Sequence, residues 1–576
     1  MKKFLKMMLA VICGILVLWI LGFTVISLIA SAGNKTAAVP AEGLLKVDLS
    51  KVQIAEQANE VLSFGAEQRI PLGLRQAVKA VEAAAEDPGV KAIYLKPDMA
   101  VLGTAQLQEF RLALSKFRQS GKPIVAYTEN LSTGSYYLAS VADKVYVTSS
   151  LGGTPTFNGL SSMLMFYGDL LERIGVKVQL IRHGKYKSAG EMFIRGNASK
   201  ENLHQTQVFI NTIWGSMVGE MAQSRGISAD KINNAIDDLK LCLPQDFVDC
   251  GLADETVDRS GLEEKLAVLA QVESFKDVKM IPFADYAKKK VKNNVRARQK
   301  IAIVYADGEI VEGLDKRNVD GDRFASIIEG IRKDSTIKAV VLRVNSPGGS
   351  VTASEKIKNE LDLISGNKPL IASYGNYAAS GGYWISNNAD KIYSDAVTIT
   401  GSIGVFGMVP EFSKVLKDVA HVGIDNVSSN KHGDMMSLTR PFTTEEYAYM
   451  QRSIEAIYER FVHIVAEARD KTPEQIDEIA QGRVWAGADA LEIGLVDEIG
   501  TLEDAIAFAA TAAGDSNLAA WNIVEYPKVN TMADLFSSMM APQDEDYSIY
   551  LKWFDNWKKG KCEFTFAAMP YRITVK

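Results

Sequence analysis

Cysteine and histidine are scarce in this chain of 576 residues, which contains four cysteines and five histidines. Neither residue type forms a cluster with the spacing of metal ligands. We therefore expect no metal site, and no motif calls for a cofactor. A disulfide between Cys242 and Cys250 stays open, because an oxidising compartment would permit one. The remaining cysteines are Cys13 and Cys562.

A concentrated basic region is also absent. Lysine and arginine total 64 against 70 for aspartate and glutamate, and no long run of one sign stands out. Proteins that bind nucleic acid usually gather positive charge on one face or along one segment. The composition therefore argues against a nucleic-acid partner.

The length of the chain exceeds what a single hydrophobic core supports, so we expect at least two domains.

Charge is missing altogether from Met7 to Ala32, just after three lysines at positions 2, 3 and 6. A helix of this length crosses the roughly 30 Å hydrocarbon core of a bilayer. Positive flanks stay in the cytoplasm, so the rest of the chain is expected outside it. We predict a single-pass membrane anchor over residues 1–33. A cleaved signal peptide is the alternative, since Ala30–Ala32 has the small-x-small form, but its apolar region is usually about 7–15 residues.

The chain repeats itself. The segment AIYLKPD beginning at Ala92 parallels AVVLRVN at Ala339, and YYLASVADKVYV at Tyr136 parallels YWISNNADKIYS at Tyr383, at the same offset. A constant offset across separated blocks indicates a duplicated domain. We predict a first repeat over residues 40–290, a second over residues 299–525, and a C-terminal extension over residues 526–576 whose role the sequence does not indicate.

Within each repeat, short β-branched runs alternate with longer amphipathic segments. AVVLRV and PLIASY are of the first kind, and Arg323–Asp334 is of the second. This alternation predicts an α/β fold with a largely parallel sheet and crossover helices. Strands that are apolar almost throughout fit a sheet covered on both faces.

The repeats differ where the second one carries a glycine pair. Strand AVVLRV runs into NSPGGS in the second repeat, whereas the first repeat has Asp98 there and no glycine pair. A Gly-Gly turn at the carboxyl end of a parallel strand can present backbone N–H groups to a developing oxyanion. Gly348 and Gly349 are therefore candidate oxyanion donors, and the sequence does not decide between them.

A second difference concerns one serine. The stretch GNYAASGGYWIS, Gly375 to Ser386, surrounds Ser380 with small residues that leave its hydroxyl open. The first repeat places Thr133 opposite it, or Ser132 if the alignment slips by one. Ser380 is thus the candidate nucleophile. The alternative, a serine that merely caps a helix, stays open.

A serine nucleophile needs a base. His432 follows Ser380 in the chain, but no His–Asp arrangement is evident from the sequence. A lysine whose pKa is lowered by burial can serve instead. The first repeat contains HGKYKSAGEMFIR, which sets Lys185 and Lys187 among small residues, and Lys431 lies in the matching part of the second repeat. One repeat would then carry the serine and the other the base, with an ordinary surface lysine as the alternative.

Four motifs in order, KYKSAGEMFIR, NSPGGSVTASE, NYAASGGYWIS and TGSIGVFG, resemble those of the signal peptide peptidase A (protease IV) family in its long, duplicated form. The glycine-pair and serine motifs are also similar to those of the Clp protease proteolytic subunit. The resemblance implies tandem crotonase/Clp-protease-like domains and a Ser–Lys dyad. It implies Ser380 as nucleophile, Lys187 as general base, Ser402 as the hydroxyl that orients the lysine, and Gly381 with Gly348 or Gly349 as oxyanion donors.

The same resemblance implies a membrane-anchored serine endopeptidase that degrades cleaved signal peptides through an acyl-enzyme. It would lie in the bacterial inner membrane with its catalytic domains on the periplasmic side. The expected partners are signal-peptide remnants, other short hydrophobic peptides, the membrane, and further copies of the chain in a tetramer. Two alternatives stay open: a crotonase-like acyl-CoA enzyme, which would typically use a carboxylate base, and a catalytically inactive membrane scaffold.

Overall fold

The computed structural model describes residues 14, 39–58, 69–152, 155–313, 318–528 and 565–568. The predicted anchor over residues 1–33 lies outside these ranges except for Gly14. No helix within the described ranges is both long and apolar enough to cross a bilayer. Of the predicted C-terminal extension, the structure describes residues 526–528 and the short strand Thr565–Ala568.

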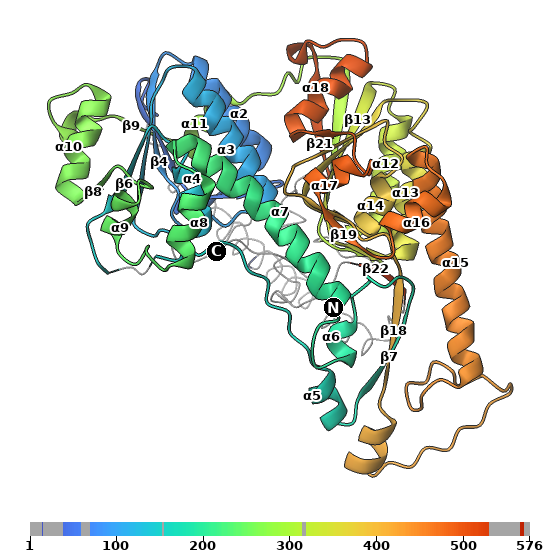
Figure 1. The fold of residues 1–576 in the computed structure, drawn as a ribbon. Coiled ribbons are helices and arrows are strands. Elements are labelled where there is room, and N and C mark those ends of the chain that lie inside the picture. Colours follow the sequence, from blue (N-terminus) through green and yellow to red (C-terminus); the bar gives the residue numbers. More distant parts are fainter. Residues whose placement is uncertain are drawn as a thin grey trace.

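A six-stranded parallel sheet forms the first half of the molecule, in the order β8-β6-β5-β4-β1-β9 (Figure 1). In chain order its strands are β1 (Gly43–Asp48), β4 (Val90–Lys96), β5 (Ile124–Thr128), β6 (Lys144–Thr148), β8 (Glu255–Val257) and β9 (Met280–Pro282). A small parallel pair, β2 (Val52–Ala55) with β3 (Ile70–Gly73), precedes the first helix.

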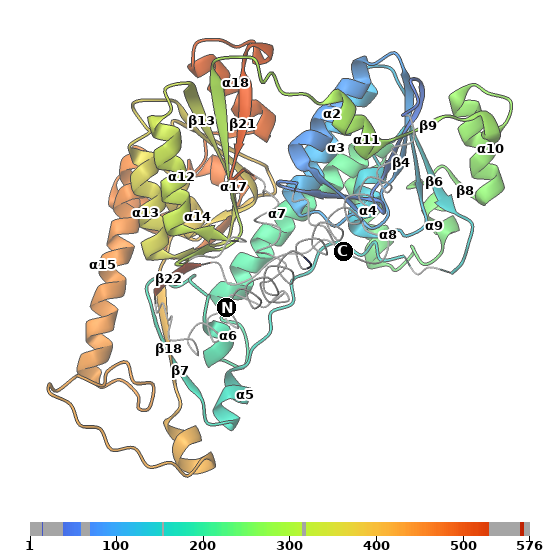
Figure 2. The ribbon, with the colours of Figure 1, turned by 180° about the vertical axis from the view of Figure 1, so that it is seen from behind.

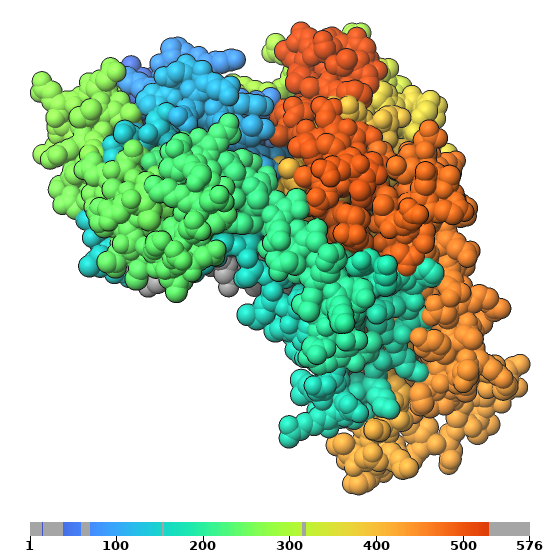
Figure 3. All heavy atoms as spheres, in the orientation of Figure 1, coloured from blue at the N-terminus to red at the C-terminus, as the bar shows by residue number. Residues whose placement is uncertain are grey.

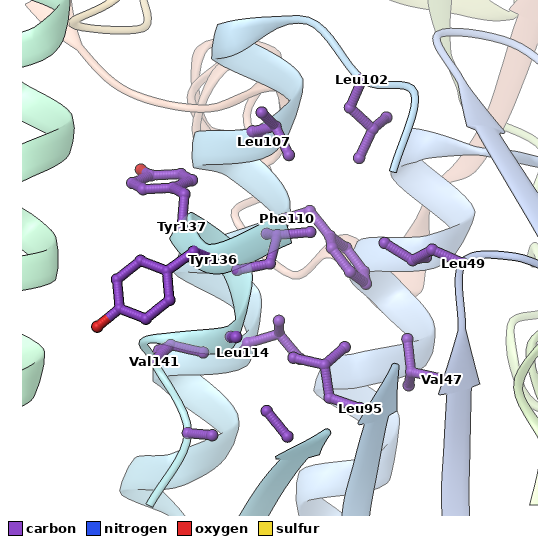
Figure 4. Close-up of a cluster of buried hydrophobic side chains, with 14 of the residues drawn as sticks. Val47, Leu49, Leu95, Leu102, Leu107, Phe110, Leu114, Tyr136, Tyr137 and Val141 are labelled. Atoms are coloured by element: carbon purple, nitrogen blue, oxygen red, sulfur yellow. The ribbon is translucent and has the colours of Figure 1, made fainter. Parts of the chain in front are cut away.

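Both faces of this sheet are buried. Leu45 packs in the larger hydrophobic cluster with residues of α2 (Leu74–Glu86) and α3 (Thr104–Gln119), whereas its neighbour Leu44 packs in a cluster with α10 (Arg259–Ala270). Figure 4 shows the first cluster, with Val47 and Leu95 of the sheet facing Phe110 and Leu114 of α3. Helices on both faces explain why these strands read as almost continuous apolar runs.

The remaining helical elements of the first half include one that is exceptionally long, α7. They are α4 (Thr133–Ala139), α5 (Gly168–Arg173), α6 (Glu191–Ile194), α7 (Lys200–Arg225), α8 (Ala229–Asp237), α9 (Pro244–Asp249), η1 (Phe275–Asp277) and α11 (Phe283–Lys290).

The second half is built on a sheet in the order β19-β17-β15-β13-β10-β21, with β16 and β20 branching from β15. Strands β21, β10, β13, β15, β16 and β20 are parallel and succeed one another as β9, β1, β4, β5, β6 and β8 do. This shared topology confirms the duplication that the repeated sequence blocks predict. The strands are β10 (Lys300–Asp307), β13 (Ile337–Ser346), β15 (Leu370–Ala379), β16 (Lys391–Ser394), β17 (Ile399–Gly401), β19 (Val484–Ala486), β20 (Glu498–Ile499) and β21 (Asn522–Tyr526).

The predicted amphipathic segment Arg323–Asp334 falls in helix α12 (Gly321–Lys333), whose Asp320 side chain caps its first turn. The other helical elements of this half are α13 (Val351–Asp362), α14 (Gly381–Ser386), η2 (Val415–Val419), α15 (Thr444–Ala468), α16 (Pro473–Ile479), α17 (Gly487–Glu492), α18 (Leu502–Ala512) and η3 (Leu518–Ala520). Helices α12 and α13 cover one face of the sheet and α18 covers the other.

A buried ion triad joins the two halves. The guanidinium of Arg343, on β13, lies 2.9 Å from a carboxylate oxygen of Glu56 and 2.5 Å from one of Glu109, both in the first half. All three side chains are buried. Removing one partner from such a group leaves an uncompensated buried charge, which typically costs about 3–5 kcal/mol. The triad therefore links the two repeats within their buried interface.

A third, mixed sheet also contains strands from both halves, in the order β12-β11-β14-β22-β18-β7. Strand β7 (Lys177–Arg182) belongs to the first half, and β11 (Ile310–Val311), β12 (Val319–Asp320), β14 (Gly348–Ser350) and β18 (Phe406–Glu411) to the second; β22 is Thr565–Ala568. Strands β7 and β18 form an arm that extends below the second half, and α7 runs from this arm toward the first half (Figure 2). The outline of the molecule is concave between the first half and this arm (Figure 3).

Candidate active site

Ser380 stands at the junction of strand β15 and helix α14, with backbone angles φ 55° and ψ −113°. A residue with a Cβ rarely adopts this left-handed region, and such strain concentrates at functional sites. The N–H of Ser380 donates to the carbonyl of Gly401 at 2.8 Å, which holds the turn. Its hydroxyl makes no cap hydrogen bond to the helix, so the helix-cap interpretation does not describe this serine.

The two glycines after Ser380 are required by close backbone approach. A Cβ on Gly381 would lie 2.8 Å from the Ser354 hydroxyl and 3.1 Å from Gly348 Cα, and one on Gly382 would lie 2.6 Å from the carbonyl oxygen of Ser346. The small residues around Ser380 thus bring helix α14 directly against the glycine-pair turn.

Lys187 reaches Ser380 from the other repeat. Its Nζ lies 2.8 Å from Ser380 Oγ, and 3.1 Å from both the carbonyl oxygen and Oγ of Ser402. All three side chains are 0% exposed. The structure therefore brings together Ser380, Lys187 and Ser402, which the sequence separates widely.

Burial lowers the pKa of Lys187 well below its ordinary value, and no carboxylate among the described residues opposes that shift. Desolvation disfavours the ammonium form and therefore favours the neutral amine. A neutral amine has two N–H bonds and one lone pair. When the two oxygens of Ser402 accept both N–H bonds, the lone pair is available to accept a hydrogen bond from the Ser380 hydroxyl.

Two glycines that the sequence reasoning did not single out line the stem of Lys187. A Cβ on Gly482 would lie 2.5 Å from the Cβ of Lys187, and one on Gly404 would lie 3.2 Å from its Cδ. Gly404 closes the TGSIG motif, which offered a signal for it. Gly482 stands in a segment that nothing in the sequence marked.

The turn that carries Lys187 is clamped on both sides. Tyr186 N–H donates to Gln481 O at 2.9 Å, and the Arg182 guanidinium donates to Lys187 O at 2.7 Å. Arg182 also pairs with the fully buried Glu191 at 3.1 Å. From α7, the Gln205 amide donates to Tyr186 O at 3.0 Å and accepts from Val484 N at 3.2 Å. These contacts hold the first-repeat turn against the second repeat.

The candidate oxyanion donors lie close together beside Ser380. Gly381 is the first residue of α14, so its N–H has no partner within the helix. A Cβ added to Gly381 would lie 3.1 Å from the Gly349 nitrogen, so the glycine-pair turn lies directly against the start of helix α14. Gly348 N–H donates to Ser346 Oγ at 3.2 Å.

The other candidate bases lie elsewhere. Lys431 pairs with Glu445 and is 71% exposed, and His432 is hydrogen-bonded to Glu446 at 2.9 Å. The Lys185 amine lies over the ring of Tyr186 at 5.3 Å. Among the described residues, Lys187 is the lysine that contacts Ser380.

The equivalent site in the first repeat is structural. Ser132 caps helix α4 by accepting from Ser135 N at 3.2 Å, and the Thr133 hydroxyl donates to Gly159 O at 3.2 Å. Both hydroxyls are thus hydrogen-bonded to nearby backbone atoms.

Cys242 and Cys250 both carry free thiols, so the disulfide that the sequence left open does not form in this structure.

Comparison with known proteins gives a consistent result. The family model described as "Peptidase family S49" matches residues 116–273 and 363–515, more than half of the chain. The chain is 35% identical over 499 residues to protease 4 of Haemophilus influenzae, covering 83% of this chain and 80% of that protein. It is 29% identical over 476 residues to the chloroplastic serine protease SPPA of Arabidopsis thaliana, covering 79% of this chain and 67% of that protein.

A solved structure of a ClpP1 mutant from Listeria monocytogenes is more distant. It is 18% identical, covers 35% of this chain and 94% of its own, and has a TM-score of 0.24. This similarity therefore supports no conclusion about the fold. The expectation of a Clp-like fold rests on the resemblance of the motifs.

Proposed function

This chain belongs to peptidase family S49 and is a serine protease, and from that premise we propose that Ser380 and Lys187 form its catalytic dyad. The observation that carries the proposal is the 2.8 Å contact between the Ser380 hydroxyl and a buried amine with a lowered pKa. A general base must lie within hydrogen-bond reach of the proton that it abstracts and must be unprotonated near the working pH, which for a lysine means the neutral amine.

The reaction follows from this geometry. Lys187 takes the Ser380 proton as Oγ attacks the carbonyl carbon of the substrate, and the N–H of Gly381 with one from the Gly348–Gly349 turn stabilises the oxyanion. The ammonium then gives its proton to the departing amine, which leaves an ester on Ser380. A water molecule, deprotonated by Lys187, attacks this ester; the bond to Ser380 Oγ breaks, the Lys187 ammonium returns its proton to Oγ, and the acid is released. Ser402 is a positioning residue that holds the amine.

For the substrate, we propose signal-peptide remnants left in a bacterial inner membrane. Two features support this: the uncharged run from Met7 to Ala32, and the motif resemblance to signal peptide peptidase A. An anchor would place the periplasmic catalytic halves beside these apolar peptides. We also propose assembly into a tetramer, as the resemblance implies for the long form of the family.

Activity-based labelling tests the dyad. A fluorophosphonate should add its mass to the full-length wild type, and not to Ser380→Ala or to Lys187→Ala at neutral pH. Labelling of Ser380→Ala would assign the nucleophile elsewhere. No labelling of the wild type, together with no peptide hydrolysis, would favour an inactive scaffold, and turnover of an acyl-CoA would favour the crotonase-like alternative.

Matched peptides test the substrate. Full-length protein in detergent should hydrolyse a quenched peptide carrying the apolar region of a signal peptide at least tenfold faster than a polar peptide of equal length. Equal rates would contradict the preference for signal peptides while leaving the dyad intact. Cross-linking and mass photometry of the same preparation test the tetramer.

A further inference from the structure

One short backbone segment, residues 481–483, lies between the turn that carries Lys187 and the TGSIG motif of the second repeat. On the side of the turn, the carbonyl of Gln481 accepts a hydrogen bond from Tyr186 N at 2.9 Å. A Cβ added to Gly482 would lie 2.6 Å from the Cα of Lys187. The backbone of the first-repeat turn therefore rests directly on this segment of the second repeat.

The same segment is hydrogen-bonded to the TGSIG motif on its other side. Gly482 N donates to Ile403 O at 2.8 Å, and Arg483 O accepts from Ser402 N at 2.7 Å. Ser402 is the residue whose two oxygens contact the Lys187 amine. A shift of residues 481–483 would therefore change the position of the amine relative to both of these oxygens.

This segment has a backbone conformation that other contacts have to maintain. Gln481 has a φ of 54° and Gly482 a φ of 76°, so two successive residues lie in the left-handed region. A residue with a Cβ persists there only where its surroundings hold it. The Tyr458 hydroxyl, on helix α15, accepts from Gln481 N at 3.2 Å and donates to the Asp477 carboxylate. Asp477 also accepts from the side-chain amide of Gln481 at 2.6 Å. Tyr458 and Asp477 thus hold both the backbone and the side chain of Gln481.

The ring of Tyr458 also contacts the Lys187 turn itself. It stacks on the ring of His183, with 3.9 Å between the ring centroids and 21° between the ring planes. The next residue, Gly184, packs against the supporting segment, because a Cβ there would lie 2.5 Å from the Gln481 carbonyl oxygen. Tyr458 is 4% exposed. One buried side chain therefore contacts both the first-repeat turn and the segment on which that turn rests.

The Lys187 amine itself is remote from the charges of this region in its hydrogen bonding. Charged or titratable groups on the turn and on the elements packed against it include His183, Lys185, Arg182 with its partner Glu191, Tyr458, Asp477 and Arg483. Among the described residues, the hydrogen bonds of the amine go to Ser380 and Ser402. Burial is the cause of its lowered pKa, and burial depends on how closely the turn is packed. The pKa of Lys187 therefore reports the position of the turn.

We propose that Tyr458 is a positioning residue for the general base: by holding Gln481 and His183, it fixes the Lys187 turn against Ser402 and keeps water away from the amine. This inference rests on the proposed function and adds a residue of helix α15 to the site. Loss of the Tyr458 contacts loosens the turn and hydrates the amine, so the pKa of Lys187 returns toward its ordinary value of about 10.4. Because only the neutral amine accepts the proton of Ser380, the reaction then needs a higher pH.

The pH dependence of active-site labelling tests this in the full-length protein. The second-order rate constant for fluorophosphonate labelling of the wild type should rise with pH to a plateau, with its midpoint at the pKa of Lys187. Tyr458→Phe removes one hydroxyl and should raise this midpoint by about one pH unit or more, which makes labelling about tenfold slower below both midpoints. Tyr449→Phe, on the same helix but 58% exposed, is the matched control and should keep the wild-type midpoint. An unchanged midpoint in Tyr458→Phe overturns the proposal, even if the melting temperature falls.

Substitutions of His183 decide the same point if Tyr458→Phe does not fold. His183→Ala removes the ring that stacks on Tyr458 and should also raise the midpoint. His183→Phe restores a flat ring and should return the midpoint most of the way to that of the wild type. Equal midpoints in these two variants overturn the proposal.

The same measurements separate this inference from the proposed function. If Lys187→Ala is labelled at the wild-type rate, Lys187 is not the base, and both the dyad and the role of Tyr458 are overturned. If labelling depends on Lys187 but has the same midpoint in the wild type and in Tyr458→Phe, the dyad stands and the inference alone is overturned.

Discussion

The Nζ of Lys187 lies 2.8 Å from the Oγ of Ser380, although 193 residues separate them in the chain. Each residue comes from a different repeat, so neither repeat holds the dyad alone. The contact is maintained by the β7–β18 pairing, the Gln205 hydrogen bonds and the Glu56–Arg343–Glu109 triad. The candidate dyad thus spans the two repeats, and its geometry depends on the interface between them.

Replacing Lys187 should lower the activity and raise the stability of the folded protein. Lys187→Met keeps the length of the side chain and removes an amine that burial deprives of its hydration. We expect kcat/KM to fall at least about 10³-fold and the melting temperature to rise. Activity assays and calorimetry on the same preparation check both, with the exposed Lys185→Met as control. A lower melting temperature would contradict the assignment of a strained, desolvated amine.

The gain in stability should depend on pH with a definite sign. The pKa of Lys187 is lowered in the folded state, so the unfolded chain binds one more proton between that lowered pKa and about 10.4. Wild-type stability attributable to this residue therefore rises with pH across that window. The advantage of Lys187→Met should be larger at pH 6 than at pH 10.

Ser402→Ala should impair the dyad without removing it. One of the two acceptors of the Lys187 amine disappears, whereas the carbonyl of residue 402 remains. We expect kcat/KM to fall about 10–100-fold with the melting temperature nearly unchanged. Ser402→Thr retains a hydroxyl and should recover part of the loss. Full activity in Ser402→Ala would show that the carbonyl alone orients the amine.

Gly482→Ala should displace the stem of Lys187. Its Cβ would lie 2.5 Å from that of Lys187, and its φ of 76° also disfavours a side chain. A displacement near 1 Å can cost about 10²-fold in rate, so we expect kcat/KM to fall 10–100-fold. Gly366→Ala is the matched control, because it has a φ of 82° but nothing within 4 Å of the added atom. Equal effects of the two substitutions would attribute the loss to backbone strain.

The triad should make stability sensitive to pH through Glu109. Burial raises the pKa of Glu109 to about 7, although the Arg343 charge opposes this shift. The stabilisation of the folded state that is linked to this raised pKa is fully present below about pH 4.3, the pKa of a glutamate in the unfolded chain. It is lost as the pH rises through about 7. The melting temperature of Glu109→Gln minus that of wild type should therefore increase between pH 5 and pH 8. The exposed Glu459→Gln should show no such trend, and a flat difference for Glu109→Gln would contradict the raised pKa.

Much of this architecture is local in origin and could be predicted. Repeated blocks, alternating strands and amphipathic segments are properties of short stretches, so the α/β duplication and the helix at Arg323–Asp334 follow from the sequence. The same holds for Ser380, because only small residues permit the approach of its neighbours to the glycine-pair turn. The resemblance of four short motifs then supplied Lys187 and Ser402 as its partners.

The amino-acid sequence by itself determined the two repeats, the small-residue surroundings of Ser380 and the set of candidate lysines. Residue spacing alone left Lys185, Lys187 and Lys431 open and the motif resemblance indicated Lys187; the tertiary structure buries Lys187 and places its amine 2.8 Å from the Ser380 hydroxyl. It also brought Gly482 against Lys187 and Thr565–Ala568 against the glycine-pair turn. Contacts between segments this far apart depend on how the two domains pack, and no local pattern of residues encodes them.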